Sequence, residues 1–426
     1  MAAWQKERDA GWSWVILFAS FITQMITLGT ILCFGLYFVI LRDHFKCTRQ
    51  EVAGIGGTAY GIFCITGPLS GLLYRKFGCR PIVITGGLIS SLGLLISSLV
   101  SDRWHLYLSY GLLTGFGFGL SYTPSVGVLA DYFEKYRFFA TAFVSVGSAV
   151  GTLILSPFLL YLVEHYHWRG SMLITAGLAL QLVVCGSIMK SRTVQSDLSL
   201  TALLELSLLK NKKFLLLLVH GFLLGGLCFV VFSMANSLAT SRGISLAASA
   251  LLVSVISACN GLGRLGASVI GHCPRTDRLL YVAVTSGCAG LGALIAPLCY
   301  DFVSFAFVLG WLGLHYGMTY SQMSGVAIDL FGTQKLVNAV GYFVCTMGVG
   351  GLLIPPVAGR LVDQTNKTEL AFILAGITGL LSFAATALVY LIRWREQKSV
   401  GKQGGTELEV AMNADNDVSM MSGEKV

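Results

Sequence analysis

Long apolar runs are the feature of this sequence that most limits what the chain can fold into. A helix that crosses a bilayer needs about 20 consecutive, mostly apolar residues, and twelve such stretches occur along the chain. Their predicted ranges are 12–39, 52–74, 81–101, 104–130, 138–163, 170–189, 214–238, 247–271, 278–298, 303–330, 336–362 and 369–392. The alternation of apolar and polar residues typical of a membrane β-barrel does not recur. The sequence therefore predicts an all-α membrane protein with twelve transmembrane helices.

Composition supports this prediction and excludes other classes. Of the 426 residues, 55% are hydrophobic and 12% are charged, whereas soluble domains carry about 25% charged residues. The apolar content is too high for a disordered chain, and 11 scattered cysteines do not form the framework of a disulfide-rich secreted protein. The net charge of +8 is not gathered in a basic stripe with aromatic residues, so nucleic acid is not expected as a partner. The partner that the composition predicts is the lipid bilayer.

Enzyme motifs are missing from the sequence. It contains no metal-ligand cluster, no nucleophile elbow and no phosphate-binding loop. We therefore predict that the chain is not an enzyme and needs no cofactor or metal ion.

The polar segments divide the chain into five parts. Residues 1–11 are predicted to be a cytosolic amino terminus, 12–189 a six-helix bundle, 190–213 a cytosolic linker, 214–392 a second six-helix bundle, and 393–426 a disordered cytosolic tail. The first apolar run has no basic leader of signal-peptide length and no small-residue cleavage site, so we expect it to remain as a true span.

The distribution of basic residues predicts the orientation. With the amino terminus in the cytosol, 20 of the 29 Lys and Arg residues fall in cytosolic segments and 7 in external ones, and Arg264 and Arg360 lie inside spans. Cytosolic segments carry such an excess in membrane proteins. Both termini are therefore predicted to be cytosolic. The same orientation places Asn366, in an Asn-Lys-Thr triplet, outside as a candidate glycosylation site.

An internal repeat relates the two halves of the chain. The segment 119–133 resembles 317–331 at an offset of 198 residues, which aligns Tyr122 with Tyr320 and Asp131 with Asp329. Because each half holds six spans, the two halves run through the membrane in the same sense. Such a parallel repeat is typical of the major facilitator fold, in which two bundles rock about a site between them.

Charged residues recur at the predicted cytosolic ends of corresponding spans. We interpret them as a gate whose salt bridges hold the cytosolic side closed; the residues are Arg75, Arg80, Asp131, Arg137, Asp329 and Lys335. The alternative is that they only end helices and set topology, since an exposed ion pair contributes about 0–1 kcal/mol.

Arg264 is the strongest candidate for a binding residue, because an ionisable group inside a span is costly unless it is paired or hydrated. Asn260 lies four residues earlier on the same helical face. A guanidinium matches a carboxylate in bidentate fashion, so we predict that Arg264 binds a substrate carboxylate. The alternative is a permanent ion pair with another helix. Weaker candidates, equally compatible with core packing, are Tyr122, Tyr320, His315 and Gln24.

Three motifs resemble those of the monocarboxylate transporters, solute carrier family 16. They are Asp9-Ala-Gly-Trp-Ser-Trp14 at the first span, Tyr132-Phe-Glu-Lys-Tyr-Arg137 with alanines after it, and His167-Trp-Arg-Gly170 before the sixth span. The resemblance implies a major facilitator fold, a small carboxylated substrate and transport across the plasma membrane. It also implies a possible single-span immunoglobulin-type glycoprotein as an ancillary partner.

Two departures from that family bear on the mechanism. The resemblance implies that proton-coupled members use a lysine in the first span and an aspartate four residues before the arginine, where this chain has Leu32 and Asn260. We therefore expect facilitated diffusion or exchange of a carboxylated solute without the usual proton-coupling pair. The alternatives are a proton-coupled symporter of the lactate and pyruvate type and a non-transporting receptor on the same scaffold.

Overall fold

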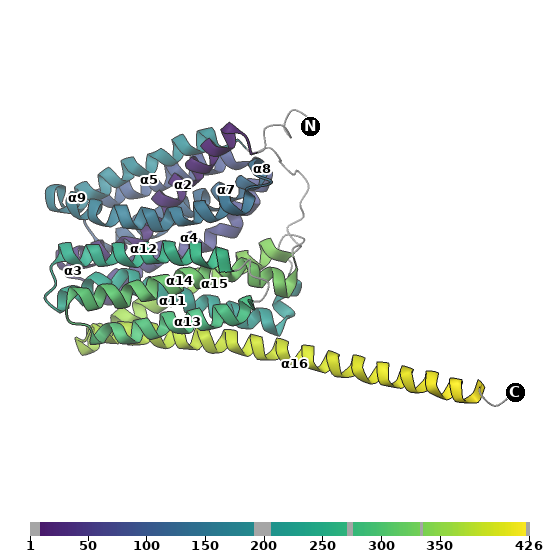
Figure 1. Ribbon diagram of the computed structural model, residues 1–426. Coiled ribbons are helices and arrows are strands. Elements are labelled where there is room, and N and C mark those ends of the chain that lie inside the picture. Colours follow the sequence, from purple (N-terminus) through teal and green to yellow (C-terminus); the bar gives the residue numbers. More distant parts are fainter. Residues whose placement is uncertain (1–8, 191–205, 271–275, 333–334, 423–426) are drawn as a thin grey trace.

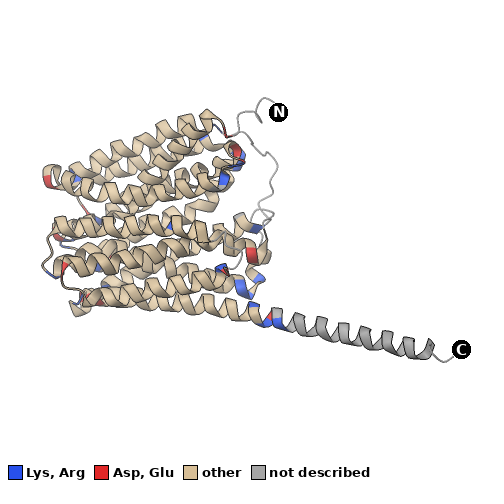
Figure 2. Cartoon of the chain, in the orientation of Figure 1, with Lys and Arg blue, Asp and Glu red and all other residues tan. Residues whose placement is uncertain are grey.

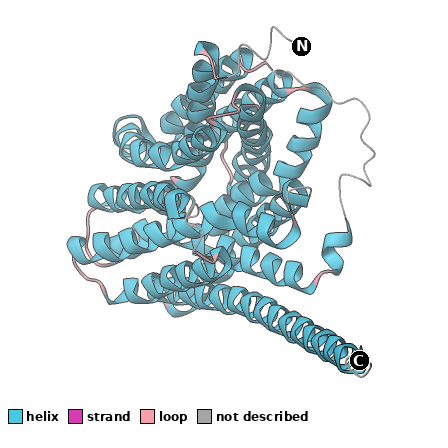
Figure 3. Cartoon of the chain, turned by 45° about the vertical axis from the view of Figure 1, so that its right-hand side comes forward, coloured by secondary structure: helices cyan, strands magenta, loops and turns pink. Residues whose placement is uncertain are grey.

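The computed structural model describes residues 9–190, 206–270, 276–332 and 335–422. This part of the chain is helical throughout, and no strand occurs in it (Figure 3). The first half contains α2 (Gly11–Leu32), α3 (Phe34–Phe45), α4 (Arg49–Phe77), α5 (Cys79–Leu99), α6 (Arg103–Leu106), the π-helix η1 (Tyr107–Thr114), α7 (Gly115–Gly127), α8 (Leu129–Tyr132) and α9 (Arg137–Ile188). The second half contains η2 (Leu206–Lys210), α11 (Lys212–Ser241), α12 (Leu246–Ile270), α13 (Arg278–Ile295), η3 (Ala296–Leu298), α14 (Phe302–Phe331), α15 (Leu336–Thr365) and α16 (Glu369–Ser422).

The twelve predicted spans correspond to 11 long apolar helical segments in the described part of the chain. The difference arises at α9, which contains two predicted spans and is interrupted at His167, where φ is 58° and ψ is 174°. Before the interruption, Gly151 packs against Gly29 of α2. After it, Ser91 of α5 donates to the Ala176 carbonyl, and Met189 returns to Cys79. The chain therefore reverses its direction at His167, and α9 runs through the bundle twice, once before and once after that residue.

Several helices begin at a polar cap, which satisfies backbone donors at the first turn. Thr48 and Glu51 form a capping box at the start of α4. Asp102, Asn211, Asp277 and Asp301 cap α6, α11, α13 and α14 in the same manner with a side-chain oxygen.

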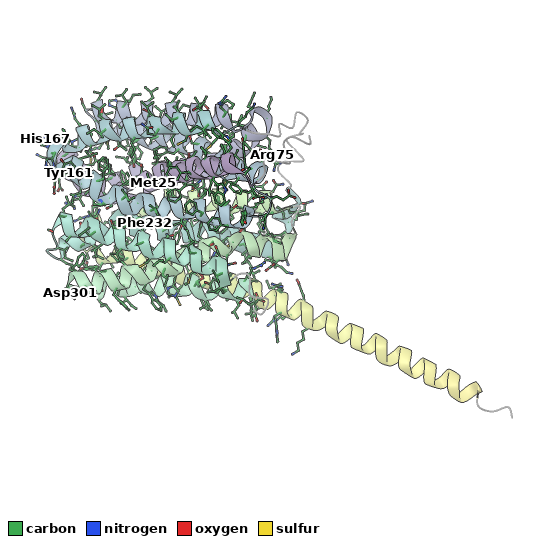
Figure 4. The ribbon with its side chains drawn as sticks, turned by 45° about the horizontal axis from the view of Figure 1, so that its top comes forward. Met25, Arg75, Tyr161, His167, Phe232 and Asp301 are labelled. Atoms are coloured by element: carbon green, nitrogen blue, oxygen red, sulfur yellow. The ribbon has the colours of Figure 1, made fainter. Side chains whose placement is uncertain are left out.

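Charged residues lie mainly at the two ends of the bundle and the middle is largely uncharged (Figure 2). We call the end at which α2 begins and α16 leaves the bundle the linker end (Figure 1). The opposite end, with Tyr161, His167 and Asp301, is the far end (Figure 4). An apolar middle between two charged ends is the arrangement expected of a protein that spans a membrane.

Two pairs of helices that the repeat relates join the halves, α4 with α15 and α12 with the first part of α9, and α3 also contacts α11. Figure 1 shows α12 between the first-half helices above and the rest of the second half below. Adding the 198-residue offset to α4 gives 247–275, close to α12, and subtracting it from α15 gives 138–167, the first part of α9. The repeat therefore maps the α4–α15 contact onto the contact between α12 and the first part of α9, as a two-fold axis between the halves requires.

Close backbone contact at one of these crossings depends on glycine. A Cβ atom on Gly57 of α4 would lie 2.9 Å from the Gly351 carbonyl oxygen of α15. The missing side chains allow the two helices to approach more closely than any larger residue would permit.

The end of the chain differs from the sequence-based prediction of a disordered tail from 393. The backbone of α16 is helical from Glu369 to Ser422 and extends past the bundle in Figure 1. The sequence has no proline after Pro356, so no residue there removes a backbone donor, and Glu, Lys, Gln, Ala and Met favour helix.

Candidate functional site

The guanidinium of Arg264 lies between the two halves. Its side chain is on α12 and the residue is only 3% exposed. The Nε donates a 2.8 Å hydrogen bond to Oδ1 of Asn260, and Nη1 donates a 2.8 Å bond to the Ser145 carbonyl of α9 in the other half. The guanidinium carbon also lies 4.7 Å from the ring centroid of Tyr320. The predicted pair Arg264 and Asn260 is therefore connected directly.

Small residues bring α12 close to its neighbours at this point. A Cβ atom on Gly317 of α14 would collide with the Asn260 carbonyl, so glycine is needed for this approach of α14 to α12. On the other side, the Cβ position of Gly261 is 3.2 Å from Ala149 of α9. These contacts place Arg264 where α9, α12 and α14 meet.

Aromatic side chains from both halves surround this meeting point. Tyr122 packs edge-on against Phe63 with centroids 4.9 Å apart, and Tyr316 stacks on Tyr320 at 6.4 Å. Tyr122 and Tyr320, which the repeat aligns, lie near each other across the two halves. The structure therefore brings together four of the predicted binding residues: Arg264, Asn260, Tyr122 and Tyr320.

Gln24 is buried within the first half and contacts α7. Its Nε2 lies 3.2 Å from Ser125 Oγ and 3.4 Å from the Tyr122 carbonyl, to which it donates. Its Oε1 has no hydrogen-bond partner among the described residues. The structure thus ties Gln24 to the backbone of Tyr122 and shows no contact with Arg264.

His315 faces a different side of α14 from the one that contacts Arg264. Its Nδ1 lies 2.9 Å from the Trp311 carbonyl and its ring is 4.2 Å from that of Trp311. Trp311 is 43% exposed and donates to the Cys288 carbonyl of α13. His315 is therefore not grouped with the other candidates.

Two site features were missed by the sequence prediction. The Ser145 contact is made by a backbone carbonyl, which no side-chain pattern reveals. His220 on α11 is completely buried, and its Nδ1 lies 2.7 Å from Ser382 Oγ and 2.9 Å from Thr386 Oγ1 of α16. An ionisable side chain inside an apolar run was the available signal for His220.

At the linker end, three of the predicted gate residues, Asp329, Asp131 and Arg80, make contacts within their own half of the molecule. Asp329 of α14 forms a 2.9 Å salt bridge with Arg278 of α13. In the first half, Tyr74 donates a 3.3 Å bond to Asp131, whereas Arg80 donates through Nε to the Ser187 carbonyl at 2.7 Å.

Three further gate residues, Arg75, Arg137 and Lys335, were predicted at this end. Arg75 is at the linker end (Figure 4). The carbonyl of Arg137 accepts a 2.9 Å bond from Thr141, and Lys335 precedes α15 as its capping residue. The Arg278–Asp329 pair therefore ties α13 to α14 inside the second half, and the gate role of these residues stays a prediction.

A direct polar connection between the halves lies instead at the far end. The carboxylate of Asp363 on α15 accepts 3.0 Å and 2.9 Å bonds from the backbone N–H groups of Arg49 and Gln50, at the start of α4. The Arg49 guanidinium is 3.8 Å from the same carboxylate. A carboxylate is favourable at a helix amino terminus, so Asp363 holds the halves together there.

Asn366 lies at the far end as the residue that ends α15, with φ 56°. The asparagine is exposed, but Thr368 of the same triplet is 4% exposed. Glycosylation of Asn366 stays a prediction.

Comparisons with known proteins agree with this architecture. Residues 13–343 match the Major Facilitator Superfamily. The chain is 32% identical to human (Homo sapiens) monocarboxylate transporter 11, over 86% of this chain and 81% of that protein. It is 30% identical to monocarboxylate transporter 3 of Rattus norvegicus, over 97% of this chain and 88% of that protein. Among solved structures, a mutant of the nucleoside transporter NupG matches with a TM-score of 0.68 and 17% identity, over 88% of this chain and 99% of that one, which supports the fold.

Proposed function

This chain belongs to the monocarboxylate transporter family of the major facilitator superfamily, and from that premise we propose that it carries a small carboxylated organic solute by alternating access. It is a multi-pass membrane transporter and not an enzyme. The residue that would bind the carboxylate is Arg264. We propose the plasma membrane as its location, with both termini cytosolic.

The burial of Arg264 at the interface between the halves is the observation that carries this proposal. A guanidinium offers five donors in a rigid planar fork that matches a carboxylate. Asn260 and Ser145 take one bond each from Nε and Nη1 and hold the fork in one orientation. Because Ser145 belongs to one half and Arg264 to the other, a rocking motion of the halves would change the surroundings of the guanidinium.

The absence of a proton-coupling pair favours transport without protons. Leu32 is 4% exposed and cannot titrate, and Asn260 stands beside the arginine where the family resemblance implies an acid. A proton-coupled symporter of the lactate and pyruvate type is the main alternative, and His315 and the buried His220 are the titratable groups to test for such a mechanism.

Uptake into liposomes that contain the purified protein tests the proposal. Labelled pyruvate, phenylacetate and L-phenylalanine would be compared at about pH 6 and about pH 7.5, a range that brackets histidine titration. We expect saturable uptake of at least one carboxylate, little stimulation by an inward proton gradient, and loss of uptake in Arg264→Ala. A well-folded protein that moves none of these solutes would favour the receptor alternative.

An ancillary glycoprotein is a separate part of the proposal. The family resemblance implies a single-span immunoglobulin-type partner. Mass spectrometry of the complex purified from cell membranes tests this; normal surface expression without any such chain would refute it.

A further inference from the structure

We propose that this protein works mainly as an exchanger, which moves one carboxylate inward much faster when it moves another outward. The inference rests on the proposed function, carboxylate binding at Arg264. It follows from the charge of Arg264, which the protein itself does not neutralise.

The contacts made by the guanidinium are all with neutral groups. Nε bonds to the Asn260 amide oxygen, Nη1 bonds to the Ser145 carbonyl, and the Tyr320 ring lies 4.7 Å away. These dipoles and the ring stabilise the cation, but none of them cancels its charge. At 3% exposure the side chain also has little contact with solvent.

No carboxylate inside the membrane could take the role of a counter-ion. Of the 21 Asp and Glu residues, only Asp329 and Glu369 fall within the twelve predicted spans, and each is at a span end. Both already have cationic partners: Asp329 lies 2.9 Å from Arg278, and Glu369 lies 2.9 Å from Arg242. The negative charge that balances Arg264 therefore has to come with the substrate.

The loaded and the empty carrier therefore differ in the net charge of the site. With a monocarboxylate bound, guanidinium and carboxylate sum to zero. Without it, the site holds one positive charge that must pass through a state closed to water on both sides, and an unpaired charge within a bilayer is strongly unfavourable. Reorientation of the loaded carrier is therefore fast and that of the empty carrier slow, so a cycle proceeds mainly by exchange.

Exchange and net uptake should respond differently to the membrane potential. Exchange of one monocarboxylate for another moves no net charge, so it should not respond to potential. Net uptake carries one negative charge inward, because the empty carrier returns its positive charge to the outside. An inside-positive potential should therefore accelerate net uptake.

The experiment uses the full chain in liposomes and the two labelled acids named above that carry a net charge of −1, pyruvate and phenylacetate. Uptake is measured into vesicles that hold the same unlabelled acid and into vesicles that hold none, at potentials set with potassium and valinomycin. We expect at least about tenfold faster uptake into loaded vesicles, with a response to potential only in the unloaded ones. Equal, potential-independent rates in both would overturn the inference while leaving carboxylate transport intact. No uptake of any acid in either would overturn the proposed function as well.

Two substitutions at one position isolate the cause. Asn260→Asp places an acid beside Nε, which cancels the charge of the empty site and leaves the loaded site with one negative charge. The ratio of uptake into loaded vesicles to uptake into unloaded vesicles should therefore fall toward one. Asn260→Ala removes the same amide but keeps the charge, so it should retain the wild-type ratio. A similar fall of this ratio in both variants would contradict the assignment to charge. The wild-type potential dependence remains decisive if the aspartate variant does not fold.

Discussion

The charge and the shape of Arg264 can be tested separately. Arg264→Ala removes both, and loss of a charge-assisted hydrogen bond of about 1.5–3 kcal/mol corresponds to roughly ten- to hundredfold weaker apparent affinity. Arg264→Lys keeps the charge but not the planar fork, so its affinity should fall between the wild type and the alanine variant. The half-saturation concentration for uptake measures both. Arg360 is the other arginine within a predicted span and is exposed on α15. Arg360→Ala should leave the half-saturation concentration for uptake unchanged.

His220 is expected to stabilise the second half without binding substrate. Its Nδ1 connects to Ser382 and Thr386 of α16, and its ring stacks on Phe343 of α15 at 5.8 Å. His220→Ala removes these contacts and leaves a void, so we expect a loss of about 1–3 kcal/mol in unfolding free energy. Thermal unfolding in detergent would show a lower midpoint, with the half-saturation concentration unchanged. An altered pH dependence of uptake would instead assign His220 to proton coupling.

Asp363 connects two helices across the halves, so its removal should loosen the far end. Asp363→Ala abolishes the bonds to the start of α4 and should favour separation of α15 from α4. Leu352→Cys on α15 reports this, because the Leu352 side chain packs against Gly61 of α4. We expect severalfold faster labelling of that cysteine by an impermeant thiol reagent when Asp363 is replaced.

The repeat provides a matched control for this prediction. Glu164 on α9 corresponds to Asp363 when the register of the repeat is shifted by one residue, to an offset of 199, and it is exposed at the same end of the bundle. Glu164→Ala should leave the labelling rate at Leu352→Cys unchanged. Equal acceleration by the two substitutions would mean that loss of negative charge, and not loss of the connection, opens the far end.

Close packing at the α4–α15 crossing predicts unequal effects of two similar substitutions on α4. In Gly57→Ala, the added Cβ would lie 2.9 Å from a backbone oxygen of α15, so the helices must separate. In Gly67→Ala, the nearest atom would be Thr123 Oγ1 at 3.5 Å, an ordinary contact. Uptake and thermal stability should fall clearly in the first variant and stay near wild type in the second. Equal tolerance would show that the crossing can adjust.

The helices were predictable because each apolar run must satisfy its own backbone hydrogen bonds in lipid. The boundaries of the helices were less predictable than their existence. The break at Cys33 between α2 and α3 has no proline or glycine to mark it, and the reversal at His167 depends on a backbone conformation that one residue adopts.

In the site, Arg264 and Asn260 were predictable as polar groups in a span. The Ser145 contact and the Asp363 connection were not, since both depend on backbone groups of helices far apart in sequence.

The two ends of the whole molecule differ in how they join the halves. At the far end, Asp363 crosses from α15 to α4. At the linker end, the Arg278–Asp329 pair and the Tyr74–Asp131 bond each remain inside one half. An alternating-access carrier separates its halves at one end at a time. The contact made by Asp363 is one that must break for the far end to open, and the gate role of the charges at the linker end stays a prediction.

Orientation of the whole molecule is the last prediction. Cytosolic loops of membrane proteins carry an excess of Lys and Arg, and the segments assigned to the linker side hold 20 of these residues against 7 on the far side. We therefore expect the linker end to face the cytosol. An epitope after Val426 should be detected only in permeabilised cells, whereas an epitope inserted beside Asp301, at the far end (Figure 4), should be detected in intact cells. Detection of the carboxyl-terminal epitope in intact cells would reverse the orientation and place Asn366 in the cytosol, where it could not be glycosylated.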